Sequence, residues 1–190
     1  VMIARGDLGV EVPMEQVPAL QKKIVRKCRR ASTPVIIATQ MMESMIEQAT
    51  PTRAEVNDVA TAVYDGTDAV MLSAETSVGK YPIKVVEAMV KIIEEIEFHG
   101  HIPKHEFPPV EKNDRYISNS ICYHACKLAD QVAAKALVCM TYTGFNAFKI
   151  SSHRPVADIC VFTNNKNILN TLSLLWGTKG FYYNEEKDTD

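Results

Sequence analysis

The sequence lacks the features of several protein classes. No apolar run approaches the roughly 18–20 residues that a membrane-spanning helix needs, and no segment resembles a secretory leader. No charge of one sign dominates, because 21 basic residues stand against 23 acidic ones and leave a net charge of -2. We therefore expect neither a membrane nor a nucleic acid as partner.

The sequence also lacks the cysteine pattern of a disulfide scaffold. Its five cysteines are an odd number in a chain long enough to build an apolar core. They are typical of reduced thiols in a cytoplasmic protein. Cys122 and Cys126 could suggest a metal site with His124. On a helix, however, the two cysteines share a face while His124 points about 200° away, so buried thiols are the better interpretation.

Alternation of strands and helices is the main signal in the first half. Three apolar runs, Val1–Ala4, Val35–Ala38 and Ala69–Leu72, do not alternate with polar residues, which is typical of parallel strands buried on both faces. Each run precedes a segment with helical periodicity. This α/β pattern fits a doubly wound sheet or part of a (β/α)8 barrel, and a complete barrel needs roughly 250 residues.

A second, smaller α/β domain follows a stretch without periodicity. We expect the first domain at residues 1–98, a linker rich in proline and histidine at 99–113, and the second domain at 114–190. The pattern of the second domain predicts helices over 117–132, 145–152 and 168–176. It predicts strands over 136–140, 159–162 and 180–183.

Both ends of the sequence suggest a piece of a longer protein. The chain begins directly in an apolar run, without a polar segment or an initiator methionine. It stops in the polar residues 185–190, where a further strand is expected. We expect both ends to lie inside a longer chain.

Candidate functional residues follow each apolar run of the first half, where parallel α/β folds place their sites. After the first run, Gly6 lets a ligand approach the backbone, Asp7 is a hard oxygen ligand suited to Mg2+, and Arg5 adds a positive charge. Thr39 follows the second run, and Ser73 with Glu75 follows the third. Considered alone, the first group fits an ordinary turn with an Asp cap equally well, and a helix cap is the commoner explanation of Thr39 and of Ser73 with Glu75.

Four strings in order settle the choice between these alternatives. They are Ala4–Gly9 (ARGDLG), Ala38–Ile46 (ATQMMESMI), Pro51–Glu55 (PTRAE) and Met71–Thr76 (MLSAET). In order and spacing they resemble strands six to eight of the pyruvate kinase barrel. The second half is similar, more loosely, to that family's C-terminal domain. The resemblance implies a partial (β/α)8 barrel followed by a smaller α/β domain.

The resemblance also implies a reaction and roles. Pyruvate kinase transfers the phosphoryl group of phosphoenolpyruvate to ADP, giving pyruvate and ATP. Asp7 is then expected to bind Mg2+ (or Mn2+), and the N–H groups of Gly6 and Asp7 to hold the substrate carboxylate. Thr39 is expected to lie near the enolate carbon, Ser73 and Glu75 to form a proton route behind it, and Arg5 to support the substrate with its charge.

Other parts of that family's site fall outside this sequence. The catalytic lysine, a second metal carboxylate, the K+ ligands and the lid over ADP belong to earlier parts of the barrel, so we expect these 190 residues alone to be inactive. The parent is expected to be a homotetramer, with Arg53 at a subunit interface. Because of this missing part, a non-catalytic module for effector binding or oligomer contacts, or a shortened inactive relative, stays an alternative.

The second half contains a candidate effector loop. Many relatives bind a phosphorylated sugar in a loop between a strand and a helix, often with an arginine. The corresponding loop here contains Thr141, Thr143, Gly144 and Asn146, but no arginine, and Phe145 follows the glycine. Its hydroxyls and free helix N–H groups suit a small phosphorylated effector, while activation by fructose bisphosphate is not expected.

Overall fold

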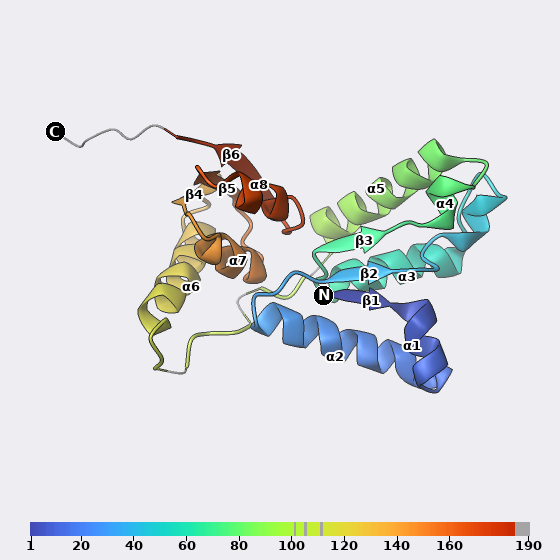
Figure 1. Cartoon of the computed structure of the whole chain (residues 1–190), viewed down its shortest axis with the longest axis horizontal. Coiled ribbons are helices and arrows are strands. Elements are labelled where there is room, and N and C mark those ends of the chain that lie inside the picture. The colour runs from blue at the N-terminus through green and yellow to red at the C-terminus, as the bar shows by residue number, and fades with distance from the viewer. Residues whose placement is uncertain (101, 105, 111, 185–190) are drawn as a thin grey trace. The chain divides into compact units, whose positions relative to one another are not determined.

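The computed structural model describes residues 1–100, 102–104, 106–110 and 112–184. The chain divides into two compact units, Val1–Pro103 and Lys104–Asp190, and each contains its own three-stranded parallel sheet (Figure 1). The polar segment 185–190 lies outside the described residues, so the expectation of a further strand beyond it stays a prediction.

The sheet of the first unit consists of the three predicted strands. β1 (Met2–Ala4), β2 (Ile36–Ala38) and β3 (Ala69–Met71) pair in the order β1-β2-β3. The apolar runs therefore predicted each strand to within one residue. Ala4 pairs with Ala38, and Ala38 pairs with Met71. These three residues are the last of their strands, so the three carboxyl ends lie level at one edge of the sheet.

Three long helices pack against these strands, each where the periodicity predicted one. They are α2 (Val17–Arg30), α3 (Arg53–Tyr64) and α5 (Pro82–His99). Shorter helical segments that the periodicity did not resolve lie in the loops: α1 (Arg5–Glu11), η1 (Met14–Gln16), η2 (Glu43–Ile46) and α4 (Ala74–Ser77).

Local chemistry explains where two of the long helices begin. Thr52 and Glu55 form a reciprocal capping box at the start of α3, which satisfies donors that a helix N-terminus leaves free. Pro82 opens α5, where its missing N–H costs no helical hydrogen bond. The core of the unit includes Met41, Met42 and Met45, all fully buried. The segment after β2 is thus anchored in the core as well as exposed at the sheet edge.

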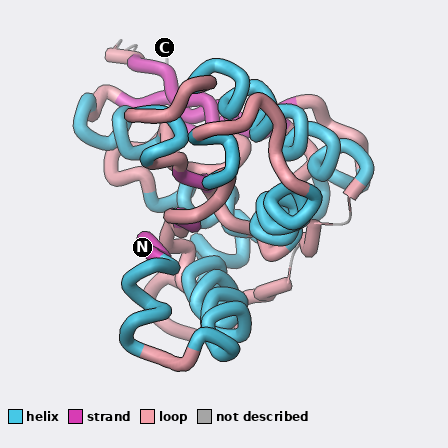
Figure 2. Tube along the Cα trace, turned by 90° about the vertical axis from the view of Figure 1, so that its right-hand side faces the viewer, coloured by secondary structure: helices cyan, strands magenta, loops and turns pink. Residues whose placement is uncertain are grey.

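The second unit also alternates strands and helices, on a smaller scale; Figure 2 colours the two kinds of element along the whole chain. β4 (Ala136–Met140), β5 (Asp158–Thr163) and β6 (Thr178–Tyr182) form its sheet. α6 (Tyr116–Gln131) and α7 (Phe145–Ser152) match the predicted helices. α8 (Lys166–Leu172) is shifted: it begins earlier than predicted, because Asn165 caps it, and ends at Leu172 rather than at Trp176.

The spacing of Ile117, Ile121, Ala125, Leu128 and Val132 predicts an apolar face for this helix, but α6 buries a different face. Ile117, Ile121 and Leu128 are 58–72% exposed, whereas Cys122 and Cys126 are in the core. Small side chains on this face let α6 approach α7, where the Cys126 thiol lies 3.9 Å from the carbonyl oxygen of Ile150. Burial raises the pKa of Cys126 to about 12. The interpretation of these cysteines as buried thiols is confirmed.

None of the helices within the described residues is long and apolar enough to cross a membrane.

The outer strands of the first sheet generate a prediction about self-association. β1 and β3 each pair on one side only in the described sheet, and Met2 on β1 is 54% exposed. Unpaired strand edges template pairing with other chains. We expect the 190-residue chain to associate with increasing concentration in sedimentation velocity, and Met2→Lys to reduce this association.

Ile83→Lys is the matched control, because Ile83 is 73% exposed but lies on the helix α5. An equal effect of the two lysines would show that general hydrophobicity drives association. A wild-type chain that stays a sharp monomer would contradict the prediction altogether.

Candidate active site

The level carboxyl ends of β1, β2 and β3 bring the predicted site residues to one edge of the sheet. Arg5 follows β1 directly, Thr39 follows β2 directly, and Ser73 comes two residues after the end of β3. Residues separated by more than thirty positions in the sequence therefore share one edge. This is the edge at which parallel α/β folds bind ligands.

Gly6 and Thr39 are in direct contact at this edge. The Gly6 N–H donates to the Thr39 hydroxyl oxygen at 3.0 Å. A Cβ added at Gly6 would meet only the Thr39 hydroxyl, at the ordinary distance of 3.7 Å. Packing within the chain therefore does not require glycine at this position, and the open space is the kind that a ligand's close approach needs. The predicted binding of a carboxylate by this N–H stays a prediction.

Thr39 and Gln40 adopt an unfavourable backbone conformation. Their φ angles are +71° and +54°, in the left-handed region. For residues other than glycine, such a conformation costs on the order of 1–3 kcal/mol each, and it is least favourable for a β-branched residue such as threonine. The surrounding contacts must therefore hold this segment in place.

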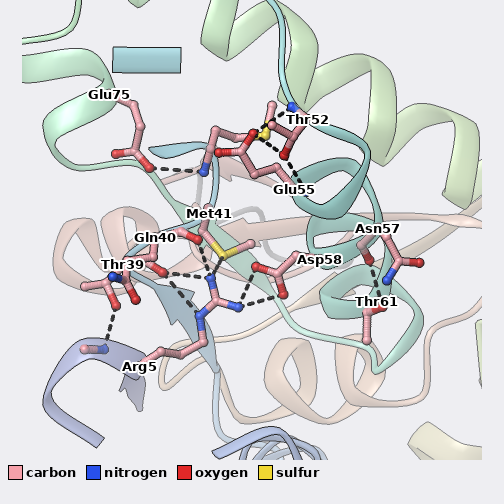
Figure 3. Close-up of polar contacts among 12 residues, drawn as sticks. Arg5, Thr39, Gln40, Met41, Thr52, Glu55, Asn57, Asp58, Thr61 and Glu75 are labelled. Carbon is pink, nitrogen blue, oxygen red and sulfur yellow. Dashed lines mark hydrogen bonds and ion pairs between the residues drawn. The ribbon is translucent and has the colours of Figure 1, made fainter. Parts of the chain in front are cut away.

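Arg5 supplies those contacts (Figure 3). Its Nε and Nη2 donate to the carbonyl oxygen of Thr39 at 3.2 and 2.8 Å, and Nη2 also donates to the carbonyl oxygen of Gln40 at 2.9 Å. Its Nη1 donates to both carboxylate oxygens of Asp58 on α3, at 2.7 and 2.6 Å. Every guanidinium nitrogen thus donates within the chain. The expected contact of Arg5 with the substrate stays a prediction. In the structure, this side chain connects the Thr39–Gln40 backbone to Asp58.

Asp7 differs from Arg5 because it is exposed and has no hydrogen-bond or ion-pair partner among the described residues. It lies in the first turn of α1, where N–H groups lack helical acceptors. Its carboxylate suits Mg2+ as a hard oxygen ligand. No group of three metal-ligating side chains occurs in the described parts of the chain. The predicted binding of Mg2+ by Asp7 therefore stays a prediction.

Glu75 connects the loops after β2 and β3. Its side chain is almost fully buried, and its two oxygens accept the N–H groups of Met42 at 3.2 Å and of Ser73 at 2.7 Å. Ser73 itself is exposed. The predicted proton route through this pair stays a prediction. The contacts show a carboxylate that satisfies two backbone donors and fixes two loops.

Glu55 has a similar role beside η2. Its carboxylate accepts the Ser44 N–H at 2.6 Å, the Ser44 hydroxyl at 2.5 Å and the Thr52 N–H at 2.8 Å. Partial burial alone raises the pKa of Glu55, but these hydrogen bonds outweigh it and hold the pKa below its ordinary value.

Two site features have no local sequence signal. Asp58 lies 53 residues from Arg5, and nothing in the sequence distinguishes it from other acidic residues on the surface of a helix. Nothing in the sequence around Thr39 indicates that its φ angle is positive.

Arg53 is exposed at the start of α3, and its place at a subunit interface stays a prediction.

The comparisons with known proteins agree with this geometry. The family model described as pyruvate kinase, barrel domain, matches residues 1–86, and the one described as pyruvate kinase, alpha/beta domain, matches residues 119–190. The chain belongs to the pyruvate kinase family. The partial barrel and the smaller α/β domain expected from the four strings are confirmed.

Individual pyruvate kinases match along nearly the whole chain. The enzyme of Agrobacterium vitis is 46% identical over 95% of this chain and 37% of its own length. That of Corynebacterium glutamicum is 45% identical over 100% of this chain and 39% of its own length. A crystal structure of a pyruvate kinase from Cryptosporidium parvum superposes with a TM-score of 0.85, at 38% identity, over 97% of this chain and 38% of that one. The chain thus spans about two fifths of the length of these relatives.

The predicted effector loop lies at the carboxyl end of β4. The Thr141 hydroxyl accepts the Gly144 N–H at 3.0 Å, and the guanidinium of Arg115 lies 4.6 Å from the centre of the Phe145 ring. Gly144 has a φ of +81°, and an added Cβ would lie 2.8 Å from the Phe148 ring, so both conformation and packing favour glycine there. A hollow of about 370 Å³ opens beside Thr141 and Tyr142, at the carboxyl ends of the strands. Arg115, which the sequence analysis missed, brings a positive charge to a loop without an arginine of its own.

Glu75 provides a stability prediction. Glu75→Gln replaces one acceptor oxygen with an NH2 group that faces a backbone N–H, so we expect a loss of about 1–3 kcal/mol. Hydrogen-exchange mass spectrometry should show faster exchange in residues 39–46 and 72–79. The control Glu87→Gln changes an exposed residue of α5. Unchanged exchange in both loops would show that the carboxylate does not hold them.

Glu55 provides a prediction about pH. A carboxyl whose pKa is lowered by folding adds stability above its unfolded pKa of about 4.3 and loses that contribution as the pH falls through the folded pKa. We expect Glu55→Gln to destabilise α3 by about 1 kcal/mol at neutral pH, and the difference to shrink at acid pH. Hydrogen exchange of residues 43–64 at several pH values measures this.

Glu87→Gln is the matched control for this measurement, because it is the same change at an exposed position of α5. Its exchange in residues 43–64 should equal that of the wild type at every pH. A difference in exchange between the wild type and the Glu55→Gln variant that is constant with pH would contradict the assigned pKa shift.

Proposed function

We propose that this chain supplies one side of the active site of a pyruvate kinase that transfers the phosphoryl group of phosphoenolpyruvate to ADP, giving pyruvate and ATP. The observation that carries the proposal is the arrangement of Asp7, Gly6 and Thr39 at the level carboxyl ends of β1 and β2. The family model of the barrel domain matches residues 1–86, which include all three.

Each residue of this edge has a defined task in the proposal. Phosphoryl transfer depends on positioning and charge neutralisation, and a divalent ion supplies much of that charge when it is bound. Asp7 provides one oxygen ligand for Mg2+ or Mn2+, and the N–H groups of Gly6 and Asp7 hold the substrate carboxylate at the start of α1. Thr39 contacts the enolate carbon, which must gain a proton to give pyruvate. Ser73 and Glu75 form the polar network behind it.

The remaining parts of the site are proposed to come from outside these 190 residues. The catalytic lysine, the second carboxylate for the divalent ion, the ligands for K+ and the lid over ADP belong to that part. We accordingly propose that the chain alone does not transfer phosphoryl groups. The size of the match supports this, because the chain spans 39% of the Corynebacterium glutamicum enzyme.

Partners beyond the substrates are also proposals. We propose a homotetramer in the cytoplasm, with Arg53 at a subunit interface, as the resemblance to the family implies. The loop of Thr141, Thr143, Gly144 and Asn146 is proposed to bind a small phosphorylated effector, with Arg115 as a nearby cation. If catalysis fails, this loop favours a regulatory module as the second candidate function.

A chimera tests the catalytic proposal. Residues 1–190 replace the matching part of the Corynebacterium glutamicum enzyme, which supplies the preceding strands and the lid. We expect formation of pyruvate from phosphoenolpyruvate and ADP in the presence of Mg2+, followed in a coupled assay. Asp7→Asn should lower kcat/KM on the order of hundredfold or more, because a metal ligand is lost. Asp114→Asn, at an exposed position, should leave the rate unchanged.

The outcomes separate the claims. A folded chimera without activity at any divalent-ion concentration would refute the catalytic proposal and favour the regulatory module. An active chimera in which Asp7→Asn is harmless would keep the function and refute the role of Asp7.

A further inference from the structure

We propose that Arg5, anchored by Asp58, is the positioning residue that holds the Thr39–Gln40 segment in its left-handed conformation and thereby fixes the Thr39 hydroxyl for the reaction. This inference rests on the proposed function, in which Thr39 contacts the substrate.

The first step is the backbone conformation of this segment. Among the described residues, five that are not glycine have a positive φ, and only Thr39 and Gln40 are adjacent. A β-branched residue followed by a second left-handed residue does not persist without external contacts. Strain of this kind concentrates at functional sites.

The second step is the match between the guanidinium and the two carbonyl groups. Nη2 of Arg5 lies 2.8 Å from the Thr39 oxygen and 2.9 Å from the Gln40 oxygen, while Nε lies 3.2 Å from the Thr39 oxygen. A planar fork with fixed N–H directions can hold both carbonyls at once. A lysine ammonium is a single point charge and cannot reproduce this geometry.

The third step is the anchor of Arg5 itself. Nη1 binds both oxygens of Asp58 on α3, and the Arg5 side chain is only 13% exposed. The neighbouring residue Gly6 holds the Thr39 hydroxyl through its N–H. Arg5 thus fixes the backbone that carries the Thr39 hydroxyl, and it does so without the Gly6 N–H, which the proposed function assigns to the substrate carboxylate.

Kinetics of the chimera distinguish positioning from direct substrate binding. Arg5→Lys keeps the charge but loses the fork, so we expect kcat to fall by roughly 100-fold, as a misplaced group can cause. The KM for phosphoenolpyruvate should change little, because no substrate contact is lost. Adding Gln40→Gly to the Arg5→Lys variant should raise its kcat about tenfold, because glycine adopts a positive φ without the cost that other residues have.

Arg26→Lys is the matched control, because it is the same change at an exposed position of α2. A substrate-binding Arg5 predicts the opposite pattern: Arg5→Lys would keep kcat and raise KM, and Gln40→Gly would restore nothing. Either of these results overturns the positioning role.

A second measurement works without activity. In the 190-residue chain, hydrogen-exchange mass spectrometry should show about tenfold faster exchange in residues 5–8 and 38–42 for Arg5→Lys, as the Gly6–Thr39 hydrogen bond opens more often. Arg26→Lys should show no change there. If the unmutated chimera is inactive, the proposed function fails while this measurement still decides: unchanged exchange with Arg5→Lys overturns the inference.

Discussion

The even register of β1, β2 and β3 is the constraint on which the site depends. Parallel pairing places Ala4, Ala38 and Met71 side by side, so the segments that follow begin at the same height. A slip of one residue in β2 would turn Ile37 out of the core and move Thr39 away from Gly6. The apolar packing that fixes the register therefore also fixes the distance between the hydroxyl and the N–H group of the candidate site.

Charged side chains then hold the irregular segments above the sheet. Asp58 anchors Arg5, Glu75 accepts N–H groups from two loops, and Glu55 accepts four hydrogen bonds from Ser44 and Thr52. Loops lack the repeating backbone hydrogen bonds of helices and strands, so their polar groups need such partners. Charge-assisted hydrogen bonds are stronger than neutral ones, which suits a segment with the strained φ angles of Thr39 and Gln40. Asp7 is left exposed, which leaves its carboxylate accessible for the proposed binding of a metal ion.

Local pattern predicted the elements of both units well because helices and strands leave a periodic trace in the sequence. The apolar runs predicted all three strands of the first sheet to within one residue, and β4 and α7 have the predicted bounds. The prediction was weaker where capping decides the boundary, as at Asn165 before α8. The large apolar residues of α6 predicted a buried face that is exposed, and the face that carries Cys122 and Cys126 packs inward instead. Periodicity marks an amphipathic helix, but the fit to a neighbouring helix selects the face that is buried.

The sequence by itself determined the α/β alternation, the loops that carry the candidate residues and the family, because ordered strings and periodic spacing are local properties. Only the tertiary structure decided that Arg5 meets Asp58 and the carbonyl groups of Thr39 and Gln40, 34 to 53 residues away. It also decided that Glu75 faces backbone N–H groups. Such contacts depend on strand register and on how each helix packs over the sheet. Neither can be read from a residue's own neighbours in the chain, because the partners come together only when the chain folds.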